Sequence, residues 1–479
     1  MNYRLIIKTI GKLLYIEALL LIIPLLCSFI YKEDIYLAYL IPISIMIILG
    51  FIFSKIKCEN NKFYQREGFF TVGLAWLILS FFGSLPFIIS QTIPNFFSAY
   101  FEATSGFTST GATVISDLTV INKSILLWRS LMNWVGGMGI LVFILAIIPQ
   151  TDSRSIYLLK AESTGPSVDK LTTKLTYSAR ILYLIYFGLT LILFLLLIIK
   201  IPLFDSINFA FATAGTGGFA IFNESIAYYN SVYVEIVIAI FMIIFGINFN
   251  IYYLILIKNF KKAFKSEELK VYLGIILTAT LLIAINTLNI YKNFFTSLRF
   301  SFFQVSSIIS TSGYTSTNFD LWPEFSKWIL IMLMFIGSCA GSTSGGIKVA
   351  RIIIYFKTIL KEIKYSIHPK RVSVITLEGK PVNESMMKGL FAFITTYIFI
   401  LIIGTLLISL NKFDFITNFT ATLTCLSNVG PGLSLVGPTG NFSIFSNFSH
   451  DVLSLIMMIG RLELFPILII FSPSLYTND

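Results

Sequence analysis

Four short segments of this sequence combine small side chains with glycine between apolar stretches. They read STGAT at 109–113, GTGGF at 215–219, TSGYT at 311–315 and NVGPG at 428–432. Glycine permits backbone conformations that turn successive carbonyl oxygens to one side, and a ring of such oxygens can replace the hydration shell of a cation. The chemistry that these segments predict is the binding of a cation by backbone carbonyls.

The register of the four segments follows from a central glycine in each. Aligned on Gly111, Gly217, Gly313 and Gly430, they have the shape of the TVGYG filter of potassium channels. A second glycine recurs only as Gly432, so we expect fewer ordered carbonyl sites and weaker ion discrimination than in a symmetric potassium channel. The carbonyls expected to bind the ion are those of Thr110, Gly111, Thr216, Gly217, Ser312, Gly313, Val429 and Gly430, and the filter is completed by Ala112, Gly218, Tyr314 and Pro431.

The composition places these segments in a membrane. The chain has 479 residues, of which 56 % are hydrophobic and 12 % are charged, whereas about a quarter of the residues of soluble domains are charged. Apolar runs of about 20 residues, enough to cross the hydrocarbon core of a bilayer, recur along the chain. The sequence leaves no room for a large soluble domain, so we expect an integral membrane protein that is not an enzyme.

Hydropathy predicts ten full spans. With both termini inside, most of the 35 lysines and arginines fall in loops on the inner side, which agrees with the positive-inside rule. We therefore expect a multi-pass protein of the cell membrane with both termini in the cytoplasm. The predicted spans are 12–31, 36–55, 68–90, 124–149, 178–201, 231–257, 270–291, 326–360, 386–410 and 450–472.

Each filter segment follows an apolar stretch that is compatible with a helix but too short to span. The order span, half-helix, loop, span occurs four times, at 66–152, 153–262, 263–366 and 367–479, after an N-terminal two-span hairpin at 1–65. Irregular backbone at membrane depth is tolerated where it lines a watery cavity, and each half-helix would direct its negative C-terminal end to the centre. We predict an all-α polytopic membrane protein with four pseudo-repeated units around one pore.

A secondary transporter for an organic substrate is the rival class. It predicts inverted repeats and polar side chains at the middle of the membrane. The repeats here run in one direction and converge their backbone, so the sequence favours a pore. No membrane-embedded carboxylate stands out as a carrier, and the sequence therefore does not separate channel-like flow from symport with H+ or Na+.

Several longer strings resemble the membrane subunit of the Trk/Ktr/HKT superfamily of potassium transporters. The N-terminal hairpin makes the chain similar to the Trk (TrkH-like) type. In this family a glycine in every filter is associated with potassium and a serine in the first filter with sodium, so the resemblance implies potassium uptake. A symporter coupled to H+ or Na+, or a sodium-permeable member, remains the alternative. The strings are WRSLMNWVGGMGILVFILAIIP (128–149), AESTGPSVDKLTTKLTYSAR (161–180), GSCAGSTSGGIKVAR (337–351), HPKRVSVITLEGKPV (368–382) and MMIGRLELFPILII (457–470).

The string at 337–346 interrupts the eighth predicted span. It is too rich in glycine and serine for a continuous helix, and it fails the phosphate-loop pattern because Ile347 follows Gly346. The resemblance implies an intramembrane gating loop below the filter, with a packing kink as the alternative. Its glycines are Gly337, Gly341, Gly345 and Gly346.

Arg461 lies within the last predicted span, where a charge is costly. The resemblance places an arginine here near the gating loop. Our hypothesis is that Arg461 hydrogen-bonds the loop and repels cations while the gate is shut. The alternative is a structural contact with Glu463 or a carbonyl.

The resemblance also implies partners. Family members form homodimers with a cytosolic ring of RCK-type (TrkA-like) subunits, through which ATP, ADP or NAD would act, and we expect this chain itself to bind no cofactor. The net charge of +11 is explained by topology and by anionic lipid, without nucleic acid. The alternative is a dock for the ring on the loop 357–388, whose central cations are Lys361, Lys364, Lys370 and Arg371.

The remaining polar residues near the filters give no firm assignment. Carboxylates at the mouth of a pore would attract cations, but helix capping or plain solvation explains them equally well. Neither His368 nor His450 receives a role. The carboxylates are Glu102, Glu224, Asp320 and Glu324.

Overall fold

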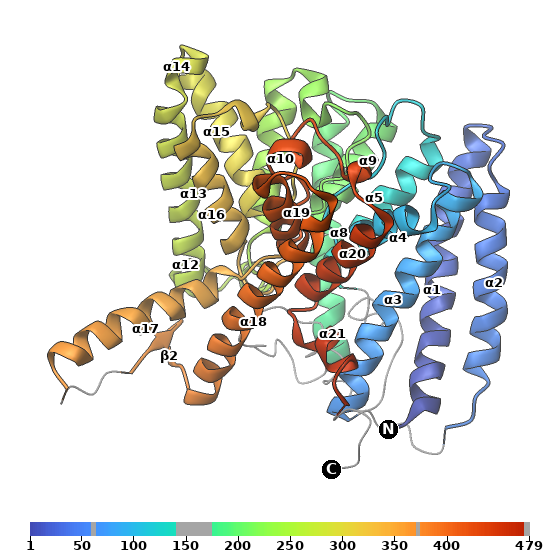
Figure 1. Ribbon diagram of the computed structural model, residues 1–479, viewed down its shortest axis with the longest axis horizontal. Helices are drawn as coiled ribbons and strands as arrows, with labels where there is room; N and C mark the ends of the chain where they lie inside the picture. Colours follow the sequence, from blue (N-terminus) through green and yellow to red (C-terminus); the bar gives the residue numbers. More distant parts are fainter. Residues whose placement is uncertain (59–63, 140–174, 370–373, 474–479) are drawn as a thin grey trace.

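The computed structural model describes residues 1–58, 64–139, 175–369 and 374–473, and over these ranges the protein is almost entirely helical. Figure 1 shows long helices around a set of shorter ones, with the α1–α2 hairpin at one side. We call the end at which α1 begins the inner end. The long unbroken helices are α1 (Tyr3–Ile30), α2 (Leu37–Ser54), α3 (Gln65–Ile89), α8 (Leu175–Leu197), α13 (Glu267–Asn286) and α18 (Glu384–Ile408).

These six helices are long and apolar enough to cross a membrane. They correspond to the first, second, third, fifth, seventh and ninth predicted spans. The first helix of each predicted unit is therefore continuous, and so is each helix of the N-terminal hairpin. The protein is an all-helical multi-pass membrane protein.

The second helix of the later units is broken, which corrects the prediction of single spans at 231–257 and 450–472. The first of these bends by 91° between α10 and α11, where Gly246 packs against the Tyr272 hydroxyl and the Asn248 side chain caps the new helix. The second breaks after Gly460, whose Cα lies against the Leu426 carbonyl. Of the predicted span 124–149, residues 140–149 lie outside the described part of the chain. The pieces are α5 (Lys123–Gly137), α10 (Val232–Phe245), α11 (Phe249–Leu256), α16 (Glu324–Ile336), α17 (Val349–Ile367), α20 (Asn447–Arg461) and α21 (Phe465–Ile470).

Four short helices lie inside the bundle and precede the predicted filter segments. At about 1.5 Å per residue they are too short to cross a bilayer. Side-chain caps begin three of them, for example Asn95, which accepts from the amides of Phe97 and Ser98. They are α4 (Phe96–Phe107), α9 (Leu203–Ala214), α15 (Phe294–Ile309) and α19 (Phe415–Ser427).

At the inner end, α17 projects from the bundle and leads to a small β-hairpin (Figure 1). The strands pair in antiparallel register, Thr376 with Pro381 and Leu377 with Lys380. Ile375 beside the hairpin is buried with Ile354 and Leu390, so the hairpin is packed on α17 and α18. The strands and remaining short elements are β1 (Thr376–Leu377), β2 (Lys380–Pro381), α12 (Phe260–Lys265), α14 (Leu288–Tyr291), η2 (Ser225–Tyr229), η3 (Phe319–Leu321), η4 (Ser409–Asn411), η5 (Ser434–Val436) and η6 (Phe442–Ile444).

Candidate functional site

Each half-helix ends in the same backbone turn. A residue just past the helix takes a left-handed conformation, with φ between +52° and +58°. The amide of the next residue donates to the carbonyl five residues earlier at 2.9–3.0 Å. The left-handed residues are Ser109, Thr216, Thr311 and Asn428, and the residues that follow them are Thr110, Gly217, Ser312 and Val429.

The third residue of each turn is a glycine with positive φ, and this corrects the register of the second filter. The glycines are Gly111, Gly218, Gly313 and Gly430, with φ of +79°, +63°, +77° and +99°. The equivalent of Gly111 is thus Gly218, not Gly217, because Thr216 occupies the left-handed position of Ser109. The carbonyls that match Thr110 and Gly111 are accordingly those of Gly217 and Gly218, and Thr216 lies one place earlier.

Contacts between neighbouring loops close the four glycines into a ring. A Cβ added to any of them would clash with a carbonyl oxygen of the next loop, so only glycine allows this approach. The clashes would be at 2.1 Å between Gly111 and Gly217 O, 1.6 Å between Gly218 and Ser312 O, 2.1 Å between Gly313 and Val429 O, and 2.6 Å between Gly430 and Thr110 O. The carbonyl that precedes each glycine therefore faces the glycine of the neighbouring loop.

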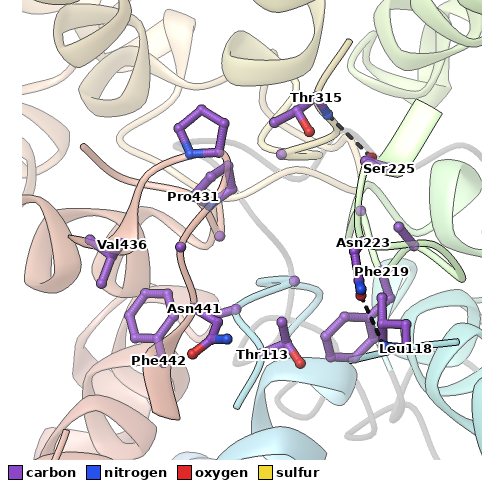
Figure 2. Close-up of a pocket in the computed structure, with 18 of the residues that line it drawn as sticks. Thr113, Leu118, Phe219, Asn223, Ser225, Thr315, Pro431, Val436, Asn441 and Phe442 are labelled. Atoms are coloured by element: carbon purple, nitrogen blue, oxygen red, sulfur yellow. Dashed lines mark hydrogen bonds between the residues drawn. The ribbon is translucent and has the colours of Figure 1, made fainter. Parts of the chain in front are cut away.

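One cavity lies against this ring, and Figure 2 shows its walls. All four ring glycines line it, whereas the buried Gly217 does not. Of the other predicted filter residues, Ala112 and Pro431 line the cavity, and the buried Tyr314 packs against Phe209 at 5.7 Å between ring centroids. The lining thus combines the glycine backbone of four loops with Arg129 and with apolar side chains such as Phe219 and Phe442. Backbone carbonyls are groups that can replace the hydration shell of a cation.

Hydrogen bonds tie each return segment to the next around the cavity. Every neighbouring pair of loops is joined by at least one bond to a backbone amide, and two of these bonds are drawn in Figure 2. The loops are thus fixed to one another as well as to their own half-helices. In order around the ring the bonds are Leu118 N to Asn223 Oδ1 (2.9 Å), Thr315 N to Ser225 Oγ (3.3 Å), Ser434 N to Asp320 Oδ2 (3.1 Å) and Phe442 N to Thr113 O (2.8 Å).

A buried ion pair lies behind the first filter. Glu102 in α4 is wholly buried and accepts from Arg129 Nε at 2.8 Å and from the Val114 amide at 2.9 Å. Arg129 in α5 also donates to Ala220 O in the second loop at 3.1 Å. Glu102 therefore braces two loops and does not lie at an open mouth to attract ions.

The gating loop, predicted at 337–346, occupies 337–348 between α16 and α17. Its ends meet, since a Cβ on Gly346 would lie 2.9 Å from the Cα of Gly337. Gly345 donates its amide to Thr311 Oγ1 at 2.8 Å, and a Cβ on it would lie 2.2 Å from Ser427 O. Gly341 O accepts from Phe249 N at the break between α10 and α11. The loop therefore lies against the third and fourth filter turns.

Arg461 ends α20 and reaches this loop. Its guanidinium, 7 % exposed, donates to Thr343 O at 2.5 Å and to the carbonyls of Gly136 and Gly137 at the end of α5. Glu463 forms an ion pair with Arg351 of α17. The predicted contact between arginine and loop is present, at a break in the helix and not in the middle of a continuous one.

The other acidic and histidine candidates are dispersed. Asp320 accepts from the Ser434 amide, as described above, and Glu324 is an exposed carboxylate paired with Lys327. Glu224 is exposed at the start of η2. His450 is buried with Nε2 2.9 Å from Phe442 O, and His368 is exposed. Lys370 and Arg371 lie outside the described residues.

Sequence reasoning missed several residues that the structure brings to the site. Thr311 and Asn428 occupy left-handed positions, and Asn428 Nδ2 donates to Thr110 Oγ1 at 3.0 Å, which joins the fourth filter to the first. Arg129, the partner of Glu102, was detectable as a charge in an apolar helix. Away from the site, Glu17 in α1 corrects the expectation that no membrane-embedded carboxylate stands out: it is 1 % exposed, and neither carboxylate oxygen has a hydrogen-bond partner among the described residues.

The chain is similar to known proteins over its whole length. The chain matches the family described as "TrkH: Cation transport protein" over residues 34–300 and 293–478. It is 34 % identical to the Trk system potassium uptake protein TrkH of Salmonella typhimurium, covering 99 % of this chain and 100 % of that protein. It is 30 % identical to the Trk system potassium uptake protein TrkG of Escherichia coli, covering 98 % of each.

A solved structure is similar over the full length. The crystal structure of the potassium transporter TrkH from Vibrio parahaemolyticus aligns with a TM-score of 0.90 at 29 % identity and covers 100 % of both chains. The sequence and the fold of this chain therefore both match one family. The protein belongs to the TrkH family of cation transport proteins.

Proposed function

We propose that this chain carries K+ across the cell membrane, usually inward, through a channel-like pathway that the four filters surround. The four units are then pseudo-repeats around one pore. The observation that carries the proposal is the ring of Gly111, Gly218, Gly313 and Gly430, in which the carbonyls of neighbouring loops meet beside one cavity. The names of the relatives, potassium uptake proteins, support K+ as the ion.

The proposed gate is the loop 337–348. It lies against Thr311 and Ser427 at the inner side of the filter turns, and Arg461 adds a buried positive charge bound to its Thr343 carbonyl. A positive charge below the filter disfavours a cation at the same place. The loop must move away from the filter turns for an ion to pass.

The proposed assembly is a homodimer with a cytosolic nucleotide-binding ring. The projecting helix α17 carries exposed apolar side chains, among them Phe356, Ile363 and Ile367, next to the half-buried Lys361 and the exposed Lys364. A surface that mixes apolar and basic residues can hold a protein or the surface of an anionic membrane. Nucleotides such as ATP, ADP or NAD would act through the ring.

The test is ion flux into liposomes that contain the purified protein alone. We expect voltage-driven uptake of K+ and Rb+, little uptake of Na+, and increased Na+ uptake in Gly111→Ser, because the added side chain must displace the Gly217 carbonyl 2.1 Å away. Absence of any cation flux, with or without an imposed voltage, would refute the proposal.

A second candidate, uptake coupled to protons, is favoured by one observation. Glu17 is a buried carboxylate without a hydrogen-bond partner among the described residues, and it lies within the span α1. Ionisable groups in spans are costly and often belong to proton relays. Rb+ uptake that requires a pH gradient in the native protein and loses that dependence in Glu17→Gln would establish this candidate; pH-independent uptake in both would exclude it.

A further inference from the structure

The β1–β2 hairpin contacts the start of α13 through its turn. Glu378 and Gly379 have φ of +51° and +74°, as in the two-residue turns that suit the twist of a hairpin. The Glu378 carboxylate accepts from Ser266 Oγ at 2.8 Å and from the Glu268 amide at 3.0 Å. The first amides of a helix lack partners inside the helix, so Glu378 stabilises the start of α13 from outside.

Glu268, whose amide donates to Glu378, contacts the gating loop through its side chain. Glu268 is 6 % exposed, and its Oε1 accepts from Ala340 N at 2.7 Å and from Ala350 N at 3.1 Å. Ala340 lies inside the gating loop and Ala350 in the first turn of α17. One carboxylate therefore accepts hydrogen bonds both from the loop and from the start of the helix that follows it.

The hairpin is also tied to the helix that follows the loop. Lys357 of α17 donates to Thr376 O at 2.7 Å and pairs with Glu267 at 2.6 Å. The hairpin, the start of α13 and α17 thus form one connected group at the inner end of the molecule. A displacement of the hairpin therefore acts on α13, whose Glu268 contacts the loop, and on α17, which follows the loop.

We infer that Glu378 and Glu268 are positioning residues that connect the β1–β2 hairpin to the gating loop; this inference rests on the proposed function of that loop as a gate. When the hairpin moves away from α13, the Glu268 amide loses its acceptor and the start of the helix shifts. The carboxylate of the same residue then leaves the Ala340 and Ala350 amides. The loop and the start of α17 then each lose one of the hydrogen bonds that fix their position.

The chemistry makes this coupling effective. Buried amides without acceptors are costly, so Ala340 and Ala350 must find new partners once Glu268 leaves. A hydrogen bond to a charged acceptor corresponds to about a tenfold change in an equilibrium. Loss of Glu378 should therefore raise the open fraction of the loop by about that factor, and loss of Glu268 by more, because Glu268 forms two such bonds.

The experiment combines hydrogen exchange with Rb+ flux on the full-length protein in liposomes. In Glu378→Ala we expect the amides of 338–350 to exchange about tenfold faster and the basal Rb+ flux to rise by a similar factor. Glu268→Ala should have a larger effect, and the double variant should not exceed Glu268→Ala, because the two residues act in series. The ratio of Rb+ to Na+ flux should not change. The control is Glu384→Ala, which removes an exposed carboxylate paired with Lys388 and should behave as the native protein does.

Three results would overturn the inference: native exchange at 338–350 in Glu378→Ala, effects of the two substitutions that add, or the same change in Glu384→Ala. If Glu268→Ala does not fold, the test uses Glu378→Ala together with Glu268→Gln. The side-chain amide oxygen of Gln can still accept hydrogen bonds from the Ala340 and Ala350 amides. Failure of the proposed function is distinguishable. In that case the native protein carries no Rb+, while hydrogen exchange still decides whether the hairpin holds the loop.

Discussion

The filter ring and the gating loop are both rich in glycine, but they are held in different ways. In the ring, each glycine admits the carbonyl of a neighbouring loop, and the loops are fixed by backbone amides and by the buried pair of Glu102 and Arg129. In the gating loop, side chains from other elements hold the backbone, including Glu268 of α13 and Arg461 of α20. Glycine allows close carbonyl packing in both, as at Gly345 against Ser427 O, but the loop depends in addition on ionic side chains from other elements.

This difference has a physical consequence. Carbonyls packed against backbone cannot move without displacing the neighbouring loop, so a ring built in this way keeps its dimensions. A loop held by a few ionic side chains loses its position when one of them rotates. Rigidity suits the selection of ions, and a small number of replaceable bonds suits a gate.

The largest effect is expected where the ring depends on a buried charge pair. Glu102→Gln leaves the guanidinium of Arg129 buried without a charged partner, which typically costs about 3–5 kcal/mol. We expect a clear fall in the thermal unfolding midpoint of the purified protein. The control is Glu324→Gln, which breaks an exposed pair with Lys327 and should cost about 0–1 kcal/mol. Equal unfolding midpoints for Glu102→Gln and Glu324→Gln would show that the pair of Glu102 and Arg129 does not stabilise the ring.

The register of the second filter is the next test. Gly218→Ala places a Cβ 1.6 Å from Ser312 O at a φ of +63°, which should cost about 3 kcal/mol and lower Rb+ flux about a hundredfold. The matched control is Gly217→Ala, whose nearest contact is the Asn133 side chain at 2.4 Å and not a carbonyl of the next loop; it should lower flux by less than about tenfold. A larger loss of flux in Gly217→Ala than in Gly218→Ala would show that Gly217 is the equivalent of Gly111.

Arg461 tests how the gating loop is held. Arg461→Ala removes donors to Thr343 O and to the end of α5, and we expect basal Rb+ flux to rise about tenfold. Arg461→Lys keeps the charge but cannot donate to all three carbonyls in the same geometry. If basal Rb+ flux stays low in Arg461→Lys, the positive charge keeps the loop closed. If the flux rises as in Arg461→Ala, the hydrogen bonds do. Unchanged basal flux in Arg461→Ala would remove Arg461 from the gate.

The smallest effect is expected at the rim of the ring. Asp117 accepts from the Thr119 side chain and amide and from Asn223 Nδ2, and these hydrogen bonds hold its pKa below the ordinary value. A lowered pKa in the folded state means that its contribution is present at neutral pH and is lost only as the pH falls through that lower pKa. Because Asp117 is exposed, water weakens these interactions, and Asp117→Asn should change Rb+ flux at pH 7 by less than about twofold. A larger change in flux would show that the rigid part of the ring includes the exposed loop around Asp117.

Much of the fold was predictable because its signals are local. Six predicted spans are single helices, and each half-helix ends where small residues and glycine begin. The break at 337–346 was visible for the same reason, since several glycines and serines cannot continue a helix. The breaks after Gly246 and Gly460 were not visible, because one glycine in an apolar run is compatible with a continuous membrane helix.

The sequence by itself determined the membrane character, the four half-helices and the position of each filter, because length, apolarity and glycine act within a few residues. Only the tertiary structure decided that Gly218, and not Gly217, joins the ring, since either glycine can take a positive φ and the neighbouring Ser312 carbonyl selects one. It also decided that Glu102 meets Arg129 and that Glu268 meets the gating loop. These partners are separated by 27 to 82 residues, and at such distances along the chain packing, not local preference, chooses which groups meet.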